Sequence, residues 1–232
     1  MNTASMNTKI KAIVTDIEGT TSSIDFVHKE LFPYASRELP AFVREHQQEA
    51  AVASQLDAVR QLIDKPQADV DVLIETLLQW IRDDNKATPL KALQGLVWAH
   101  GYESGAFTGH VYDDAVSNLK KWAAQGIDLY VYSSGSVAAQ KLLFGYSDAG
   151  DLTPLFKGYF DTRIGNKREP QAYETIVKQL AMPALAILFL SDVVEELDAA
   201  ASAGMQTIQL VREPGMTTGA HPITHNFDEI SV

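Results

Sequence analysis

Short apolar runs alternate with stretches of helical periodicity through the second half of the chain. Runs that are apolar throughout, rather than at every second position, indicate strands buried on both faces of a parallel sheet. The helical stretches between them would then cover the two faces of that sheet. The pattern predicts strands at 10–16, 127–134, 184–192 and 206–212, and helices at 113–125, 136–144, 170–181 and 193–203.

The ends of these elements carry local signals. Asp113 or Asp114 can cap the first of the helices, and Pro170 suits the first turn of the third. After Pro214 the chain is rich in turn residues, so this tail is expected to lie on the surface.

The pattern changes directly after the first expected strand. Residues 25–105 show helical periodicity without a convincing strand. An insertion of about 80 residues is long enough to pack a small core of its own. We therefore predict a doubly wound α/β domain of residues 1–24 plus 106–232, interrupted by a helical domain of residues 25–105.

Composition and charge exclude several classes of partner and chemistry. The chain has a formal net charge of −11, which should repel nucleic acid and anionic membranes. It has no cysteine, so disulfides, thiolate metal sites and thiol nucleophiles are excluded. Its first residues lack the apolar core of a signal peptide, and no run approaches the roughly 20 apolar residues of a membrane helix. We expect a cytoplasmic protein.

Polar residues follow three of the expected strands. Asp16 closes the first, with Glu18 two residues on, Ser133 and Ser134 close the second, and Asp192 closes the third. Ligands of open α/β sheets bind at the carboxyl ends of the strands, so these side chains should converge. Residues two apart in an extended segment point to the same side, which would place both acids of the first pair in one crevice.

The converging groups suit phosphate chemistry. Asp16 and Asp192 could hold one divalent cation, and a site with few protein oxygen ligands suits Mg²⁺. A carboxylate can also attack phosphorus as a nucleophile. Glu18 could give a proton to the leaving oxygen and then take one from water. Ser133 or Ser134 could donate hydrogen bonds to phosphate oxygens, near the start of the following helix.

A phosphate site also needs positive charge. Lys167 lies in a loop just before the helix that begins near Pro170, and could direct its ammonium into the crevice. Arg163 and Arg168 lie nearby and are expected to be solvated surface groups.

Each of these residues, taken alone, has an ordinary structural explanation. A strand-terminal aspartate is usually a cap or turn residue, and Asp192 is well placed to cap the helix that follows. Lys167 alone would be a surface lysine, and the two serines would be loop residues. Glu195 and Glu196 lie in the first turn of that helix, where the default role is to compensate its dipole and a role near the metal is rarer. The order and spacing of the whole set favour the functional interpretation.

With these residues in place, the chain resembles the haloacid dehalogenase-like phosphatases. The first motif of that family is an aspartate, any residue, a second acid and Gly-Thr, which matches DIEGT at 16–20. A strand-terminal serine, a lysine and an acidic strand end match Ser133, Lys167 and Asp192. A helical cap domain inserted after the first motif matches residues 25–105. The resemblance implies a Rossmann-like core, doubly wound around a parallel sheet, with that cap.

The second acid narrows the resemblance. The common family pattern has aspartate there, whereas this chain has Glu18. Glutamate is expected in the enolase-phosphatases of methionine salvage, the acireductone synthases, and the similarity to that group extends over nearly the whole chain. The segments that carry it are DIEGTTSSIDFV, LKALQGLVWAHGY, YVYSSGSVAAQKLLFGYS and FDTRIGNK.

This narrower resemblance implies a bifunctional, Mg²⁺-dependent enzyme that acts as a monomer on a small phosphorylated substrate. It would enolise 2,3-diketo-5-methylthiopentyl-1-phosphate and then remove the phosphate, which gives the acireductone 1,2-dihydroxy-3-keto-5-methylthiopentene. Asp16 would be the nucleophile and Glu18 the acid and base. Asp16, Asp192 and the backbone carbonyl of Glu18 would bind Mg²⁺, while Ser133, Ser134 and Lys167 would hold the substrate phosphate.

Three other functions stay open at this point. Another capped phosphatase of the same superfamily would share the motifs and differ in its substrate. A receiver-type signalling domain also combines aspartate, Mg²⁺, a hydroxyl and a lysine, but its acceptor is expected on a later strand, with no large insertion before the second strand. A non-catalytic binding module that kept the fold is disfavoured by the complete set of acids, hydroxyls and lysine.

Overall fold

The computed structural model describes residues 9–232, so the first eight residues of the predicted core segment 1–24 lie outside the described residues. The described residues separate into two compact units. The first combines the residues up to Ile24 with Gly109–Val232, and the second is Asp25–Thr108. The boundaries predicted from the sequence follow residues 24 and 105.

The first unit is built on a parallel sheet, as its uninterrupted apolar runs predict. Its strands are β1 Ala12–Thr15, β2 Asp128–Tyr132, β3 Phe156–Phe160, β4 Ile187–Ser191, β5 Gln206–Leu210 and β6 Ile223–Thr224. Within residues 9–232 they form one six-stranded sheet in the order β3-β2-β1-β4-β5-β6, and every described pairing is parallel. Thr15 lies opposite Val131 of β2 and Leu190 of β4, so the ends of these three strands are nearly level.

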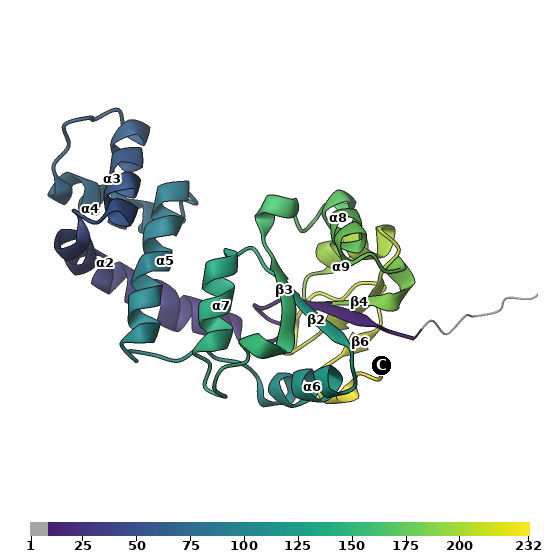
Figure 1. Ribbon diagram of the computed structural model, residues 1–232. Helices are drawn as coiled ribbons and strands as arrows, with labels where there is room; N and C mark the ends of the chain where they lie inside the picture. The colour runs from purple at the N-terminus through teal and green to yellow at the C-terminus, as the bar shows by residue number, and fades with distance from the viewer. Residues whose placement is uncertain (1–8) are drawn as a thin grey trace, which may run out of the picture. The chain divides into compact units, whose positions relative to one another are not determined.

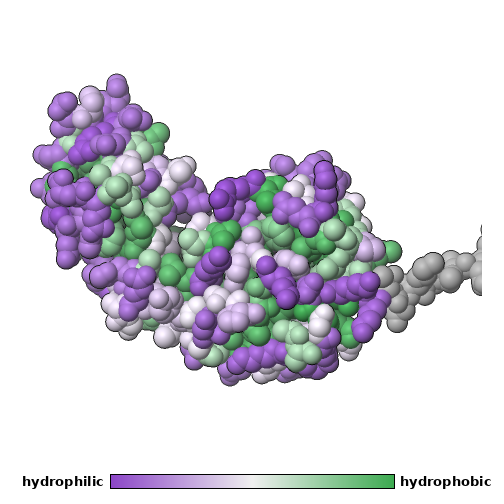
Figure 2. All heavy atoms as spheres, viewed as in Figure 1, coloured by the Kyte–Doolittle hydropathy of each residue, from purple (hydrophilic) through white to green (hydrophobic). Residues whose placement is uncertain are grey.

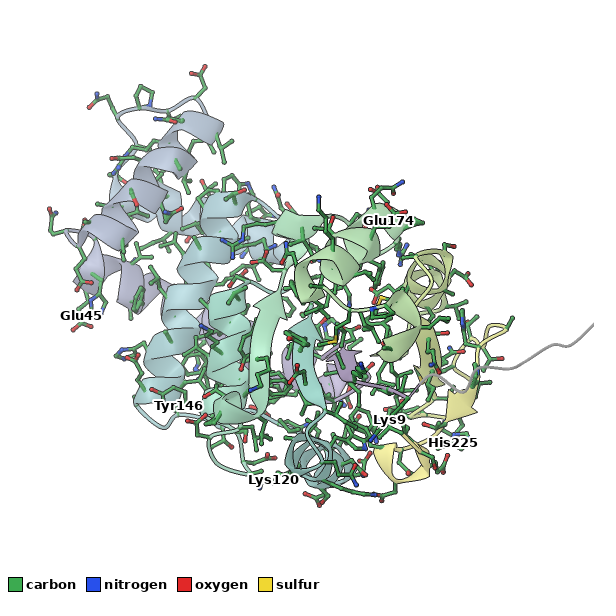
Figure 3. The ribbon with its side chains drawn as sticks, turned by 45° about the vertical axis from the view of Figure 1, so that its right-hand side comes forward. Lys9, Glu45, Lys120, Tyr146, Glu174 and His225 are labelled. Carbon is green, nitrogen blue, oxygen red and sulfur yellow. The ribbon has the colours of Figure 1, made fainter. Side chains whose placement is uncertain are left out.

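Helices cover both faces of this sheet (Figure 1). They are α6 Asp113–Ala124, α7 Val137–Gly145, α8 Pro170–Leu180 and α9 Val194–Ser202. Tyr173 of α8 and Leu197 of α9 join Val14 and Phe189 in one buried cluster on one face. Figure 3 shows α6 and α8, marked by the labelled Lys120 and Glu174, on opposite sides of the sheet. The sheet is therefore the middle of three layers.

The helix starts agree only partly with the local sequence signals. Pro170 begins α8, as predicted. Neither Asp113 nor Asp114 caps α6, because the N-cap is Tyr112 and no side chain makes the cap hydrogen bond. Both acids lie inside the first turn instead, which leaves them available for other partners.

The second unit is helical, as the periodicity of residues 25–105 predicts. The elements from residue 24 onward are α1 Ile24–Phe26, the π-helix η1 Val27–Leu31, α2 Phe32–His46, α3 Ala50–Leu62, α4 Val70–Arg82 and α5 Thr88–Glu103. Leu39, Leu73 and Leu93 are fully buried in a core formed by α2, α4 and α5 together with α3. Hydrophilic side chains dominate the face of this unit seen in Figure 2. No helix in the described part of the chain has the length and apolarity needed to cross a membrane.

The sequence pattern misses β3, which lies at one edge of the sheet. Lys157 and Gly158 interrupt its apolar residues, so it does not appear as a continuous apolar run. An edge strand has one neighbour instead of two and tolerates such a sequence.

The tail after Pro214 is mostly exposed, as expected, but Thr224, Phe227 and Ile230 within it are buried. β6 extends the sheet, and the 3₁₀ turn η5 (Phe227–Glu229) follows it. Phe227 is fully buried and stacks on Trp122 of α6, with the ring centroids 5.5 Å apart. The tail thus completes the core beside α6.

Replacing Phe227 by Ala should lower the free energy of unfolding by about 3–5 kcal/mol, because the loss of a buried aromatic ring leaves a cavity. Urea denaturation followed by circular dichroism measures this change. Leu185→Ala is the control, since Leu185 is apolar but 55 % exposed; it should change the free energy of unfolding by at most about 0.5 kcal/mol. Equal effects of the two substitutions would contradict the packing of the tail.

Candidate active site

Polar residues lie side by side at the ends of three neighbouring strands. Ser133, Asp16 and Asp192 directly follow β2, β1 and β4, which are adjacent in the sheet. Because these parallel strands end nearly level, the structure brings the predicted strand-end residues to one place, where open α/β sheets bind their ligands.

Asp16 is buried, and donors on several elements orient its carboxylate. Lys167 Nζ lies 2.7 Å from Oδ1, and the backbone N–H of Ile17 donates to the same oxygen at 2.7 Å. The Ser191 hydroxyl oxygen lies 3.4 Å from Oδ2. The backbone N–H of Asp16 continues the β1–β4 ladder by donating to Leu190 at 2.9 Å. Backbone and side chain are therefore both held at the strand end.

Lys167 is a buried group, and the interpretation of it as a surface lysine does not apply. Its side chain is 6 % exposed and bridges Asp16 and Glu196, with Nζ 2.7 Å from each carboxylate. The Tyr173 hydroxyl donates to the backbone carbonyl of Lys167 at 2.8 Å, which anchors the loop to α8. Burial disfavours the charged ammonium, but the two carboxylates outweigh this effect and raise the pKa of Lys167.

Glu196 belongs to this cluster, although its position in the sequence suggests a simpler role. It does lie in the first turn of α9, where compensation of the helix dipole is the default. Its carboxylate is buried instead, pairs with Lys167, and accepts a hydrogen bond from the Ser191 hydroxyl at 3.1 Å. Burial and the nearby Asp16 carboxylate raise the pKa of Glu196 despite the ammonium beside it. The rarer alternative, a role within the site, is the one the geometry supports.

Asp192 does not cap α9, so that interpretation is wrong. The N-cap is Val193, no side chain makes the cap bond, and the Ser191 hydroxyl accepts from the Val193 N–H at 3.1 Å. The buried Oδ1 of Asp192 has no hydrogen-bond partner among the described residues. Burial and the Asp16 carboxylate raise the pKa of Asp192 to about 6. A buried carboxylate oxygen without a donor is suited to a cation.

Gly19 packs directly against this carboxylate. Its φ of +72° lies in the left-handed region, and an added Cβ would lie 2.6 Å from Cγ of Asp192. Glycine removes both the conformational strain and the steric overlap. The loop after β1 can therefore approach the end of β4 closely.

The backbone turns as soon as β1 ends. The carbonyl of Ile17 accepts the N–H groups of Thr20, Thr21 and Ser22 at 3.1, 2.9 and 2.9 Å. Glu18 lies half-buried within this turn. From the sequence we expect Glu18 to align with Asp16, because side chains alternate in an extended strand. This expectation fails, because β1 ends at Thr15 and the chain turns before Glu18. The turn therefore determines where the Glu18 carboxyl lies.

The two serines after β2 differ in exposure. Ser133 is buried and its hydroxyl accepts the Gly135 N–H at 3.1 Å, whereas Ser134 is exposed. The Gln140 side-chain amide donates to the carbonyls of Gly135 and Phe160 at 2.8 Å each. These bonds hold the serine loop between β3 and the start of α7.

Arg163 and Arg168 are exposed, as predicted. The Arg163 side chain is 79 % exposed and pairs with Asp161 at 2.9 Å. These arginines therefore do not compete with Lys167 for the position beside Asp16.

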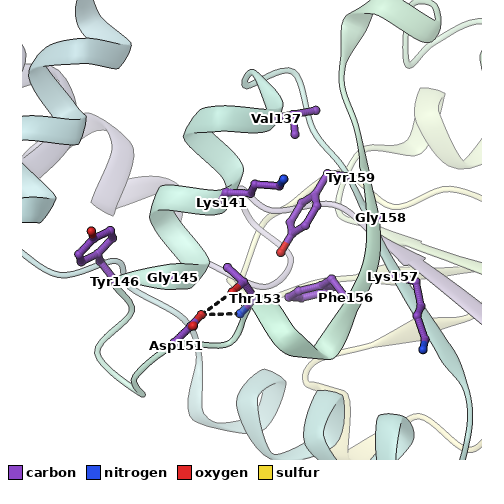
Figure 4. Close-up of a pocket in the computed structure, with 10 residues that line it drawn as sticks. All are labelled: Val137, Lys141, Gly145, Tyr146, Asp151, Thr153, Phe156, Lys157, Gly158 and Tyr159. Carbon is purple, nitrogen blue, oxygen red and sulfur yellow. Dashed lines mark hydrogen bonds between the residues drawn. The ribbon is translucent and has the colours of Figure 1, made fainter.

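A hollow on the first unit is lined by residues outside this cluster. It has a volume of about 810 Å³ and is lined by α7, the segment after it and β3 (Figure 4). Lys141 Nζ lies there 5.6 Å from the ring centroid of Tyr159. The residues that line it include none of the predicted site residues. The predicted site residues therefore lie outside this hollow.

The strand-end carboxylates fit a cation that needs few protein ligands. Within residues 9–232, no three His, Asp or Glu side chains come together as a metal-binding cluster. Mg²⁺ accepts such a site because it keeps several water ligands, whereas structural zinc sites need four side-chain ligands, mostly His or Cys. Asp16 and Asp192 therefore fit Mg²⁺, because two carboxylates suffice for an ion that keeps several waters and Oδ1 of Asp192 has no other partner among the described residues.

Comparisons with known proteins agree with this arrangement. The model of the haloacid dehalogenase-like hydrolase family matches residues 10–204. An enolase-phosphatase E1 from Pseudomonas aeruginosa (strain UCBPP-PA14) is 60% identical over 223 residues, which cover 96% of this chain and 99% of that protein. The chain belongs to the enolase-phosphatase family within the haloacid dehalogenase-like hydrolases.

Two further relatives extend the comparison. An enolase-phosphatase E1 from Erwinia tasmaniensis is 56% identical over 222 residues, covering 96% of this chain and 97% of that protein. The crystal structure of the UTR4 protein from Saccharomyces cerevisiae shares 36% identity, with a TM-score of 0.81, over 96% of this chain and 100% of that one. The predicted fold and the narrower resemblance carried by Glu18 are confirmed.

Replacing Lys167 by Met should lower the free energy of unfolding by about 3–5 kcal/mol, because Asp16 and Glu196 would stay buried without their cation. Adding Glu196→Gln should recover part of this loss, since one of the two carboxylates is then removed. Urea denaturation measures both variants.

Lys86→Met is the matched control for that substitution. Lys86 pairs with Asp84 at 3.1 Å, but the two side chains are 73% and 79% exposed, so water replaces the lost partner and little change is expected. If Lys167→Met were as mild as this control, the buried cluster would not stabilise the fold.

Proposed function

We propose that the protein is a Mg²⁺-dependent enolase-phosphatase of methionine salvage. It enolises 2,3-diketo-5-methylthiopentyl-1-phosphate and then releases phosphate to give the acireductone. The observation that carries this proposal is the Lys167 ammonium 2.7 Å from Asp16 at the end of the central strand, with Asp192 at the end of the neighbouring one. The relatives named enolase-phosphatase E1 support the same activity.

Mg²⁺ would be held by Asp16, Asp192 and the backbone carbonyl of Glu18. When bound, it would supply positive charge that neutralises the phosphate and polarises the diketone. The unpartnered oxygen of Asp192 supports this ligand set. The close approach of Gly19 to Asp192 supports it too, because the loop that carries the Glu18 carbonyl lies against the second carboxylate.

Asp16 is the proposed nucleophile for phosphate release. One carboxylate oxygen bonds to phosphorus while the bond from phosphorus to the substrate oxygen breaks, and Glu18 gives its proton to that leaving oxygen. Glu18 then takes a proton from water, whose oxygen attacks phosphorus and frees Asp16 and inorganic phosphate. Glu18 is also our candidate base for the enolisation.

The remaining predicted residues bind the phosphate in this proposal. Lys167 supplies a point charge beside the nucleophile, and its two carboxylate partners fix its direction. Ser133 and Ser134 follow β2, the strand next to the nucleophile, and donate to phosphate oxygens.

The wider features of the prediction are proposals of the same kind. Residues 1–24 and 106–232 would form the catalytic core, and 25–105 the cap domain. The partner would be a small phosphorylated molecule, not nucleic acid or a membrane, and the enzyme would be a cytoplasmic monomer. Asp16 follows β1, and helices without a strand separate it from β2, which argues against a receiver-type phosphoacceptor.

Replacing Asp16 by Asn should reduce phosphate release by roughly 10³-fold or more, because the amide is a far weaker nucleophile. A coupled assay with the diketone phosphate measures enol formation by ultraviolet absorbance and phosphate release separately, with and without Mg²⁺. Phosphate release at the wild-type rate would exclude Asp16 as the nucleophile.

The wild-type protein in the same assay tests the substrate. If folded protein showed neither activity yet hydrolysed another phosphate ester, the enolase-phosphatase proposal would fail and the general phosphatase assignment would stand.

Replacing Gly19 by Ala should lower phosphate release by about 100-fold, because the new Cβ would displace the Asp192 carboxylate from its position. The concentration of Mg²⁺ needed for half-maximal activity should rise as well. Gly105→Ala is the matched control: Gly105 has the same φ of +72°, but an added Cβ meets nothing within 4 Å. Comparable losses in the two variants would assign the effect to backbone strain rather than to Asp192.

A further inference from the structure

A buried arginine connects the C-terminal part of the chain to the loop that carries Glu18. Arg212 lies just after β5, and its side chain is 7% exposed. Its Nη2 and Nε donate to the backbone carbonyl of Thr20 at 2.7 and 3.1 Å. The sequence pattern assigns Arg212 no role beyond the end of an expected strand.

Arg212 is itself held firmly on its other sides. Its Nη1 lies 2.9 and 2.8 Å from the two carboxylate oxygens of Asp114. The guanidinium carbon lies 4.1 Å from the ring centroid of Tyr112 and 5.2 Å from that of Phe227. A planar fork that binds a carboxylate and stacks on aromatic rings at once is a property of arginine that lysine lacks.

The C-terminal tail fixes the same ion pair. The backbone N–H of Phe227 donates to Asp114 at 2.7 Å, and the Asn118 side-chain amide donates to Asp228 at 2.7 Å. Phe227 and Asp228 of η5 thus tie the tail to α6. Arg212 therefore joins three separate segments: α6, the tail and the loop after β1.

The carbonyl that Arg212 holds lies next to the catalytic residues. Thr20 directly follows Gly19, which packs against Asp192. The next carbonyl, that of Thr21, accepts the Tyr112 N–H at 2.9 Å. Two successive carbonyls of the loop are therefore held by residues 112 and 212, outside the active site. The bonds within the turn account for its shape, and these two contacts help to fix its position, together with the Ser23 N–H, which donates to His110 Nδ1 at 3.1 Å.

We propose that Arg212 is a positioning residue for the active-site loop. It holds the backbone of residues 18–20 where the Glu18 carbonyl and carboxyl can serve the metal and the proton transfers. This inference rests on the proposed function, which gives the loop its chemical role. The alternative is a purely structural role, in which Arg212 only fastens the tail to α6. The experiments below distinguish the positioning role from this structural role.

Arg212→Lys is the first test, because it keeps a charge but not the fork. We expect the rate constant for phosphate release to fall by about 100-fold, with a smaller change in the Michaelis constant. Calorimetric titration with Mg²⁺ alone, without substrate, should show weaker binding. Wild-type turnover together with wild-type Mg²⁺ affinity would overturn the proposal.

Trp122→Phe is the matched control for loosened tail packing. It weakens the stacking on Phe227 without touching the guanidinium. This variant should lose thermal stability but keep the wild-type turnover and Mg²⁺ affinity. If Trp122→Phe lost turnover and Mg²⁺ affinity to the same extent as Arg212→Lys, the tail would act on the site through packing, and the positioning role would be refuted.

Hydrogen exchange of the wild-type protein provides a test that does not depend on whether any variant folds. The amide hydrogens of Thr20, Thr21 and Ser22 should exchange together with those of Tyr112 and Phe227, because the contacts around Arg212 connect all of these segments. A loop that exchanges independently of these positions contradicts the proposal.

The outcomes separate this inference from the proposed function. If wild-type protein failed to turn over the diketone phosphate while Arg212→Lys still weakened Mg²⁺ binding and loosened the loop, the positioning role would stand and the assigned substrate would be wrong. If the wild-type protein turned over the diketone phosphate and Arg212→Lys matched it in every measurement, the proposed function would stand and the positioning role of Arg212 would be wrong.

Discussion

The ammonium of Lys167 between two buried carboxylates is the interaction on which the rest of the site depends. It joins the end of β1, the loop before α8 and the first turn of α9 through Asp16 and Glu196. Buried charges are costly unless they are paired with good geometry, so each of these three elements depends on the others to keep its charge paired. Asp192 adds a third carboxylate, which leaves an excess of negative charge beside one ammonium. That imbalance is a physical reason for a divalent cation in the proposed mechanism.

The order of the strands explains how the groups meet although they are far apart in sequence. β1 lies at the centre, so Asp16 has Ser133 on one side and Asp192 on the other. In a parallel sheet every strand ends at the same edge, and each βα connection can add a group there. The helical insertion begins soon after β1 and leaves this arrangement of strands intact.

The sequence pattern predicts the centre of the sheet well because buried parallel strands must be apolar throughout. It fails for β3 and β6, which lie at the edges and need no continuous apolar run. Asp16, Ser133 and Asp192 are predictable because functional groups follow strand ends. Glu196 and Arg212 are not, because a first-turn glutamate and a strand-terminal arginine have the same local sequence whether they face solvent or a buried partner.

The catalytic carboxylates are not needed for local structure, because other residues cap α9, form the turn after β1 and hold the loop in place. The Ser191 hydroxyl accepts the N–H group at the start of α9, so Asp192 is not needed as a cap. Gly19 accepts the left-handed backbone conformation and leaves room for that carboxylate. Arg212 holds the same loop from outside the site. The buried Oδ1 of Asp192 and the nearby Thr20 hydroxyl have no hydrogen-bond partner among the described residues, so both stay available to a ligand.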